Sequence, residues 1–214
     1  MASRKHLGSL AVLTLLLVGF PAVSFFYLKQ GADYRREALA ERGDFGKMPD
    51  LSAMEPVRGT PPPSYRGAMT VVGWLDPTKE AGTRLYGQML DSLYTQFADS
   101  PNLYFTTIVL AKDPAEAADN FARTYRLPED PMLAFVRADE RDFAASAEAF
   151  ALPLGQYDSP GIQPIVALVD SSATIVRHYD LARRDETIGL VQLISLIIPL
   201  PDKQEVILKR DKEL

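Results

Sequence analysis

The fold of this chain is decided by residues 69–110, MTVVGWLDPTKEAGTRLYGQMLDSLYTQFADSPNLYFTTIVL. The first seven residues form a near-continuous apolar run, which is typical of a strand that is buried on both faces of a sheet. Residues 103–110 form a second β-rich run. Between them, residues 80–98 place apolar side chains at helical spacing on one predicted face, namely Leu85, Tyr86, Met89, Leu90, Leu93 and Phe97.

The alternation of strands and helices continues to residue 198. The pattern predicts, in order, a helix over 115–126, a strand over 133–136, a helix over 140–151, a hairpin of strands over 165–170 and 174–180, and a helix over 186–198. Asp139 and Asp185 stand where the last two helices are expected to open. This order indicates an α/β fold with a parallel centre and an antiparallel edge. It fits a thioredoxin-like central sheet flanked by helices.

An uncharged apolar segment precedes this predicted domain. Residues 7–28, LGSLAVLTLLLVGFPAVSFFYL, are long enough to cross a bilayer as one helix. The alternative is a cleaved signal peptide, whose apolar core is shorter and is followed by small residues. Because the segment ends in Phe25, Phe26 and Tyr27 and then Lys29, we expect an uncleaved transmembrane helix. Basic residues on both sides leave its orientation open.

These features predict five consecutive parts of the chain. They are an N-terminal head (1–6), the transmembrane anchor (7–28), a stalk with a proline-rich connector (29–66), the thioredoxin-like domain (67–200) and a C-terminal tail (201–214). The connector contains Pro61-Pro62-Pro63. Three consecutive prolines fix an extended backbone, so we expect a linking segment or an early edge hairpin there.

The composition excludes several kinds of chemistry. The chain has 214 residues, a formal net charge of −5, two histidines and no cysteine. The acidic balance argues against nucleic-acid binding. Without cysteine there is no disulfide, no thiol nucleophile and no cysteine-ligated metal, and His6 and His178 are too few for an imidazole-based catalytic or metal site. We therefore expect no catalytic, cofactor-binding or metal site, and a protein that is not an enzyme.

Three strings of the sequence resemble one family. QPIVALVDSSATIVRHYD (163–180), the spacing from Asp113-Pro114 to Tyr125, and an apolar strand followed by DPTKE (76–80) occur in the order found in the SCO/SenC proteins. These are membrane-anchored, thioredoxin-fold copper chaperones for cytochrome oxidase. The resemblance spans about residues 46–198. It implies a thioredoxin-like fold and a link to respiration.

The metal-binding positions of that family are replaced here. By the resemblance, Asp76 and Glu80 stand in place of two cysteines, and Gln163 stands in place of a histidine. Copper(I) prefers thiolate, thioether and imidazole, so the family's copper site and dithiol exchange cannot form. Three oxygen-bearing side chains could instead hold a hard cation such as calcium or magnesium. The alternative is that Asp76 caps a helix after Pro77, with Glu80 in its first turn.

Three further residues have structural interpretations. We expect His178 to be solvent-facing or hydrogen-bonded rather than a lone metal ligand. Trp74 is expected in the core. The Gln163–Pro164 bond stands where thioredoxin-like folds carry a cis-proline, and the sequence leaves its isomer open.

The last predicted helix is apolar nearly all round. IGLVQLISLIIPL (188–200) is too short to cross a bilayer. One interpretation is deep packing beneath the N-terminal stalk. The other is a docking face for a membrane or partner, formed with the tail around Ile207 and with exposed side chains among Leu190, Leu193, Leu196 and Ile198.

The resemblance and the missing ligands together predict a function. We expect a non-catalytic, membrane-tethered protein that acts as an accessory subunit or assembly factor of a respiratory complex of the cytochrome oxidase type. The alternative is a protein-binding module of the cell envelope that is unrelated to respiration. The expected partners are the bilayer, through residues 7–28, and a membrane protein complex, with no nucleic acid and no small-molecule substrate. By the resemblance, the location is the inner membrane, with the soluble domain on the periplasmic side.

Overall fold

The computed structural model describes residues 13–40, 42–153 and 164–198. The chain divides into two compact units, Met1–Arg42 and Gly43–Leu214. In the first unit a π-helical turn, η1 (Leu15–Gly19), leads into α2 (Phe20–Ala40). The amide of Phe20, the residue before Pro21, donates to the carbonyl of Leu15. π-Helical turns and prolines both mark places where a helix departs from regular α geometry. By length and composition, the segment Leu15–Asp33 is apolar enough to cross a membrane.

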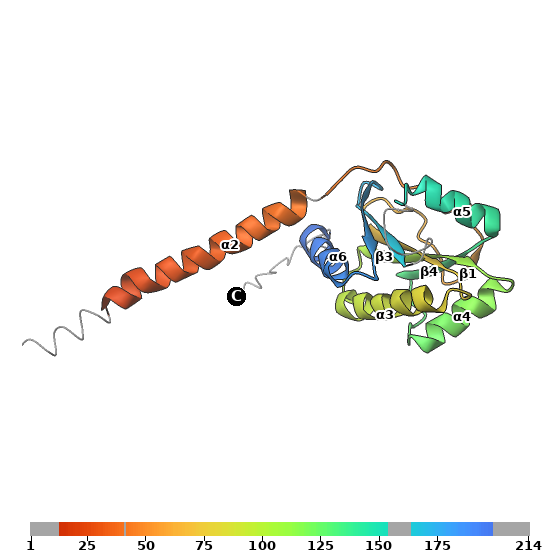
Figure 1. The fold of residues 1–214 in the computed structure, drawn as a ribbon, viewed down its shortest axis with the longest axis horizontal. Coiled ribbons are helices and arrows are strands. Elements are labelled where there is room, and N and C mark those ends of the chain that lie inside the picture. Colours follow the sequence, from red (N-terminus) through yellow and green to blue (C-terminus); the bar gives the residue numbers. More distant parts are fainter. Residues whose placement is uncertain (1–12, 41, 154–163, 199–214) are drawn as a thin grey trace, which may run out of the picture. The chain divides into compact units, whose positions relative to one another are not determined.

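Among the described residues, the second unit contains a six-stranded mixed sheet with the strand order β1-β4-β3-β2-β5-β6 (Figure 1). The central strands β2, β3 and β4 are parallel, whereas β5, β6 and β1 run antiparallel to their neighbours. The predicted parallel centre with an antiparallel edge is therefore confirmed. The strands are β1 (Pro56–Arg58), β2 (Met69–Leu75), β3 (Leu103–Leu110), β4 (Leu133–Ala138), β5 (Ile165–Val169) and β6 (Ile175–Asp180).

Helices cover both faces of the sheet. One face packs against α3 (Glu80–Phe97), α4 (Pro114–Thr124) and α6 (Arg184–Ile197), and the other packs against α5 (Glu140–Ala149). Successive side chains of a strand point to opposite faces. Consequently β2 sends Val71 and Leu75 into the core under α3, and Val72 and Trp74 into the core under α5. Burial on both sides explains why every residue of β2 is apolar or small.

Two helices begin with an aspartate cap, and the one at Asp139 was predicted from the sequence. The Oδ1 atom of Asp113 accepts from the amide of Glu116 at 3.0 Å, and that of Asp139 accepts from the amide of Asp142 at 2.8 Å. The start of α6 differs from the prediction. Asp185 does not precede this helix but lies in its first turn, after an N-cap at Arg183 that makes no side-chain bond.

The connector pairs with both edges of the sheet. Residues 43–48 run along β6, with hydrogen bonds from the amide of Gly43 to the carbonyl of Val176 (2.8 Å) and from the amide of Phe45 to the carbonyl of Ile175 (3.0 Å). At the opposite edge β1 pairs with β4. The connector is therefore not an edge hairpin, because its partners lie far away in the sequence. The connector thus covers the outer side of β6 and, through the short edge strand β1, the outer side of β4.

Helix α6 is buried at two positions that were expected to be exposed. Leu190 and Leu193 are 0% and 2% exposed and belong to the core under α3. Leu196 and Ile198 are half-buried, and Ile188 is 45% exposed. When a helix is apolar nearly all round, its sequence does not show which side faces the sheet. The predicted docking face was wrong at Leu190 and Leu193 for this reason. The tail around Ile207 lies outside the described residues.

Candidate functional site

The candidate site lies at the edge of the sheet where β2 ends. Leu75 is the last residue of β2, residues 76–79 form a turn, and α3 begins at Glu80. The parallel strands β2 and β3 have their carboxyl ends at this edge. Open α/β sheets commonly bind their ligands there. The sequence DPTKE, which stands in the place of the cysteine loop in the resemblance, thus occupies the expected position.

Hydrogen bonds inside the turn occupy Asp76. Its Oδ1 atom accepts from the amide of Thr78 at 2.9 Å and from the Oγ1 atom of Thr78 at 2.6 Å. Its carbonyl accepts from the amide of Lys79 at 2.9 Å and from the hydroxyl of Thr83 at 3.0 Å. Asp76 is therefore not the predicted N-cap, because its carboxylate closes an Asx turn two residues ahead and delays the helix. Lys79 is the N-cap of α3, and Glu80 lies in the first turn as predicted.

The three positions considered for a hard cation are not brought together in the described structure. Gln163 lies outside the described residues. Within residues 13–40, 42–153 and 164–198, no group of three histidine, aspartate or glutamate side chains is placed to hold a metal ion. Pro164 is buried, but its bond to Gln163 also falls outside the described part. A cation bound by Asp76, Glu80 and Gln163 remains an untested hypothesis.

A groove with a volume of 430 Å³ opens beside the turn, between the start of α3 and α4. Leu75, Ala117 and Phe121 give it apolar lining, and Lys112 and Asn120 add polar groups. Sequence reasoning missed this groove because its walls come from separate elements. One signal was available, since the polar residues of α4 recur every four positions at Glu116, Asn120 and Thr124.

His178 and Trp74 belong to the core under α5 rather than to the site. The Nε2 atom of His178 donates to the carbonyl of Phe150 at 2.8 Å, and its ring meets Phe45 edge-on at a centroid distance of 4.7 Å. Burial lowers the pKa of His178 and outweighs the opposing effect of that hydrogen bond. The indole nitrogen of Trp74 donates to the Oγ atom of Ser146 at 2.8 Å. His178 is thus buried and hydrogen-bonded, which is one of the two expected states, and Trp74 lies in the core as expected.

Comparisons with known proteins support the fold. No protein-family model and no curated protein sequence matches the chain. A candidate protein disulfide isomerase from Bacteroides thetaiotaomicron is similar in structure, with a TM-score of 0.56 and 17% identity, over 73% of this chain and 90% of that one. The thioredoxin domain of a thiol-disulfide oxidoreductase from Bacteroides vulgatus gives a TM-score of 0.50 and 14% identity, over 70% and 96% of the two chains.

A third similar structure bears on the resemblance seen in the sequence. A SCO1/SenC family lipoprotein from Bacillus anthracis strain Ames gives a TM-score of 0.52 and 8% identity, over 62% of this chain and 83% of that one. At these identities the similarity extends to the fold alone. The domain of this chain has a thioredoxin-like fold, which it shares with a SCO1/SenC protein and with thiol-disulfide oxidoreductases.

Proposed function

We propose that this chain is a membrane-tethered, non-catalytic thioredoxin-fold protein that acts as an accessory subunit or assembly factor of a respiratory complex of the cytochrome oxidase type. The observation that carries the proposal is the turn after β2. Where the SCO/SenC resemblance places metal-binding cysteines, this chain has Asp76 and Glu80, and the carboxylate of Asp76 is engaged by Thr78. What remains at the site is a turn beside a groove, and that arrangement suits binding.

The other strings of the resemblance have structural roles in this fold. Asp113 caps α4. The Oδ1 atom of Asp170 accepts from the amide and hydroxyl of Ser172 and from the amide of Thr174, at 2.7–2.9 Å, and thereby fixes the β5–β6 turn. Residues that build the fold are thus retained while the soft metal ligands are missing. This combination favours a protein that keeps the shape and the partnership of the family without its metal chemistry.

The tether supports the choice of a membrane complex as partner. The helical segment Leu15–Asp33 is apolar enough to cross a bilayer. Confining a domain to the membrane surface raises its effective concentration at any membrane-embedded partner. A weak contact between the domain and such a complex would then be sufficient for stable residence.

Deletion and complementation of the gene test the proposal. We expect the deletion strain to lose much of its oxidase activity and of the oxidase subunits in its membranes. The double variant D76A/E80A should restore both as well as the wild-type chain does, because the turn performs no chemistry. Normal oxidase levels in the deletion strain would favour an envelope module unrelated to respiration. A folded D76A/E80A protein that fails to complement would contradict the expectation that both carboxylates are dispensable.

A further inference from the structure

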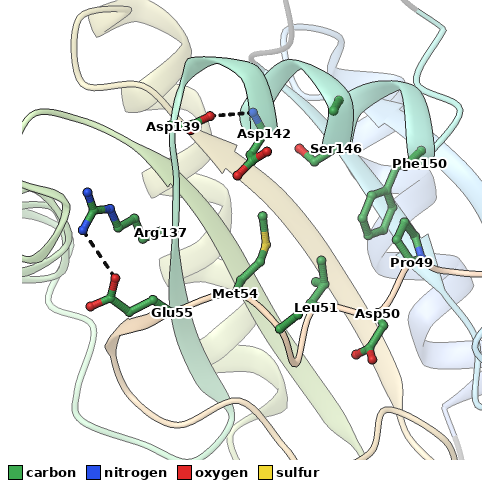
Figure 2. A pocket seen from close by; sticks show the side chains of 13 residues that line it. Pro49, Asp50, Leu51, Met54, Glu55, Arg137, Asp139, Asp142, Ser146 and Phe150 are labelled. Carbon is green, nitrogen blue, oxygen red and sulfur yellow. Dashed lines mark hydrogen bonds and ion pairs between the residues drawn. The ribbon is translucent and has the colours of Figure 1, made fainter.

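A second groove lies on the face of the sheet that α5 covers. It has a volume of 510 Å³ and runs between connector residues 49–55 and α5 (Figure 2). We call it the α5 groove. Its position separates it from the candidate site, because α3 and α4 pack against the opposite face.

Both walls of the α5 groove are held by hydrogen bonds. On the connector side, the amide of Ser52 donates to Asp50 at 2.8 Å, and the amide of Arg137 in β4 donates to the carbonyl of Glu55 at 2.8 Å. On the helix side, Ser146 donates to the carbonyl of Phe143 at 2.7 Å and accepts from Trp74 at 2.8 Å. A groove with fixed walls binds a ligand without a large ordering cost.

The floor of the α5 groove is apolar. Leu51, Met54 and Phe150 line it, and Figure 2 shows the side chain of Met54 pointing toward α5. Leu51 and Phe150 are buried, whereas Met54 is partly accessible. The hydroxyl of Ser146 is engaged by Phe143 and Trp74. An occupant therefore meets hydrocarbon at Met54 and at the exposed methyl groups of Ala145 and Ala149, with Leu51 and Phe150 buried beneath them.

The rim of the α5 groove carries uncompensated negative charge. Four exposed carboxylates line it, those of Asp50, Glu55, Asp139 and Asp142. The guanidinium of Arg137 is the cation of the lining and is paired with Glu55 at 3.4 Å. Two hydrogen bonds from Ser52 lower the pKa of Asp50. Within the described part of the chain, Asp50, Asp139 and Asp142 have no cationic partner.

We propose that the α5 groove binds a basic segment of a partner protein, with an arginine or lysine stem on the floor and the charged end at Asp50 and Asp142. An amphipathic side chain of this kind matches an apolar floor with an anionic rim. Residues 142–149 of α5 extend the groove over about 10 Å, which leaves room for an apolar neighbour of the basic residue as well. A free polyamine lacks apolar side chains for Met54 and the alanines of α5. The inference goes beyond the respiratory role and does not depend on it.

The test uses the full-length chain in non-ionic detergent micelles, labelled with ¹³C at the methionine methyl groups. The probe is the acetylated and amidated peptide Arg-Leu-Gly-Arg-Leu-Gly, compared with the same peptide carrying citrulline, a neutral isostere, in place of arginine. Met54 reports on the α5 groove, and Met89, which lines a separate groove between α3 and α6, is the internal control. We expect the arginine peptide to shift Met54 in a saturable manner, while Met89 stays in place and the citrulline peptide has little effect.

Charge variants locate the binding site. D50N and D142N should each weaken binding of the arginine peptide by about two- to fivefold, the upper part of the range for an exposed ion pair. Asn at position 50 retains an acceptor for the amide of Ser52. The matched control is E140Q, which removes a carboxylate from the same first turn of α5 without lining the groove, and should leave the affinity unchanged. An unshifted Met54 signal in each free variant verifies that the walls are intact.

Several results would overturn the proposal. The first is that Met54 does not respond to the arginine peptide, or responds equally to the citrulline peptide. The second is that E140Q weakens binding as much as D142N does. The third is that calcium chloride or spermidine alone, at the concentration of the peptide, causes the same Met54 shift. The groove would then be a site for small cations rather than for a peptide. Finally, a Met54 shift on removal of residues 203–214, without peptide, would show that the chain's own tail occupies the groove.

Discussion

Replacing Ser146 with alanine removes the hydrogen-bond acceptor of the single tryptophan in the chain. The indole nitrogen of Trp74 donates to the Oγ atom of Ser146 at 2.8 Å; Trp74 is buried beneath α5, and Ser146 lies on the buried face of α5. Alanine is smaller by one oxygen atom, so the packing of the core changes little. The principal effect is the loss of the buried hydrogen bond between Trp74 and Ser146, together with the bond from Ser146 to the carbonyl of Phe143.

The magnitude follows from the environment of that bond. A buried donor without an acceptor costs about 1–3 kcal/mol of folding free energy. Alanine in a helix interior is more favourable than serine by up to about 0.5 kcal/mol, which offsets part of the loss. We therefore expect S146A to lower the free energy of unfolding by about 1–2 kcal/mol.

Urea unfolding of the full-length chain in micelles, followed by tryptophan fluorescence, measures this loss. With one tryptophan in the sequence, the signal reports on the α5 core alone. The matched control is S195A, since Ser195 is also helical and donates to the carbonyl of Val191 at 2.8 Å, but is exposed. We expect S195A to change stability by less than about 0.5 kcal/mol.

A double-mutant cycle makes the prediction sharper. In a W74F background the indole donor is absent, so adding S146A should cost clearly less than it does in the wild type. Unfolding of these variants is followed by tyrosine fluorescence or circular dichroism. An equal cost of S146A in both backgrounds would refute the reasoning, because the bond between Trp74 and Ser146 would then contribute nothing to stability.

Three further predictions concern the core and the candidate site. G73A should lower the free energy of unfolding by about 1–3 kcal/mol, because the added methyl group would collide with the buried ring of Tyr86. That ring cannot easily move aside, since its hydroxyl is hydrogen-bonded to Thr107 at 2.6 Å. An unchanged midpoint of urea unfolding would contradict this. The free energy of unfolding should fall as the pH drops from 6.5, the ordinary pKa of histidine, toward the lowered pKa of His178. In that range the imidazole is protonated in the unfolded chain but not in the folded chain, so protons favour unfolding. H178Q should flatten that slope in urea titrations between about pH 7.5 and 5, and an equal slope would count against it. Copper(I) titrated into the full-length chain against a competing chelator should form no stoichiometric complex, and a tight one-to-one complex would overturn our interpretation of Asp76, Glu80 and Gln163.

The central part of the fold was predictable because its signals are local. β2 and β3 match the predicted ranges 69–75 and 103–110, since burial on both faces produces continuous apolar runs. The buried face of α3 follows from the helical spacing of its apolar residues. The start of α3 at Glu80 agrees with the predicted range 80–98, whereas the alternative of a cap at Asp76 was wrong, because that carboxylate accepts from Thr78 instead.

The remaining features depend on contacts between distant parts of the sequence. β1 has three residues, too few for any periodic pattern, and it exists because β4 offers an edge. The α5 groove joins segments as far apart as Glu55 and Arg137, and neither segment shows a motif. The turn after β2 lies where the sequence put residues 76–80, but the groove beside it becomes visible only once α4 is packed against α3.

Purification of the full-length chain from native membranes tests the proposed function most directly. The tagged protein is extracted in a mild non-ionic detergent, beside an unrelated single-pass protein carrying the same tag. We expect haem absorbance and oxidase subunits to be retained with the chain in near-stoichiometric amounts and to be absent from the control. Recovery of the intact chain without haem and without oxidase subunits would contradict the assignment to a respiratory complex.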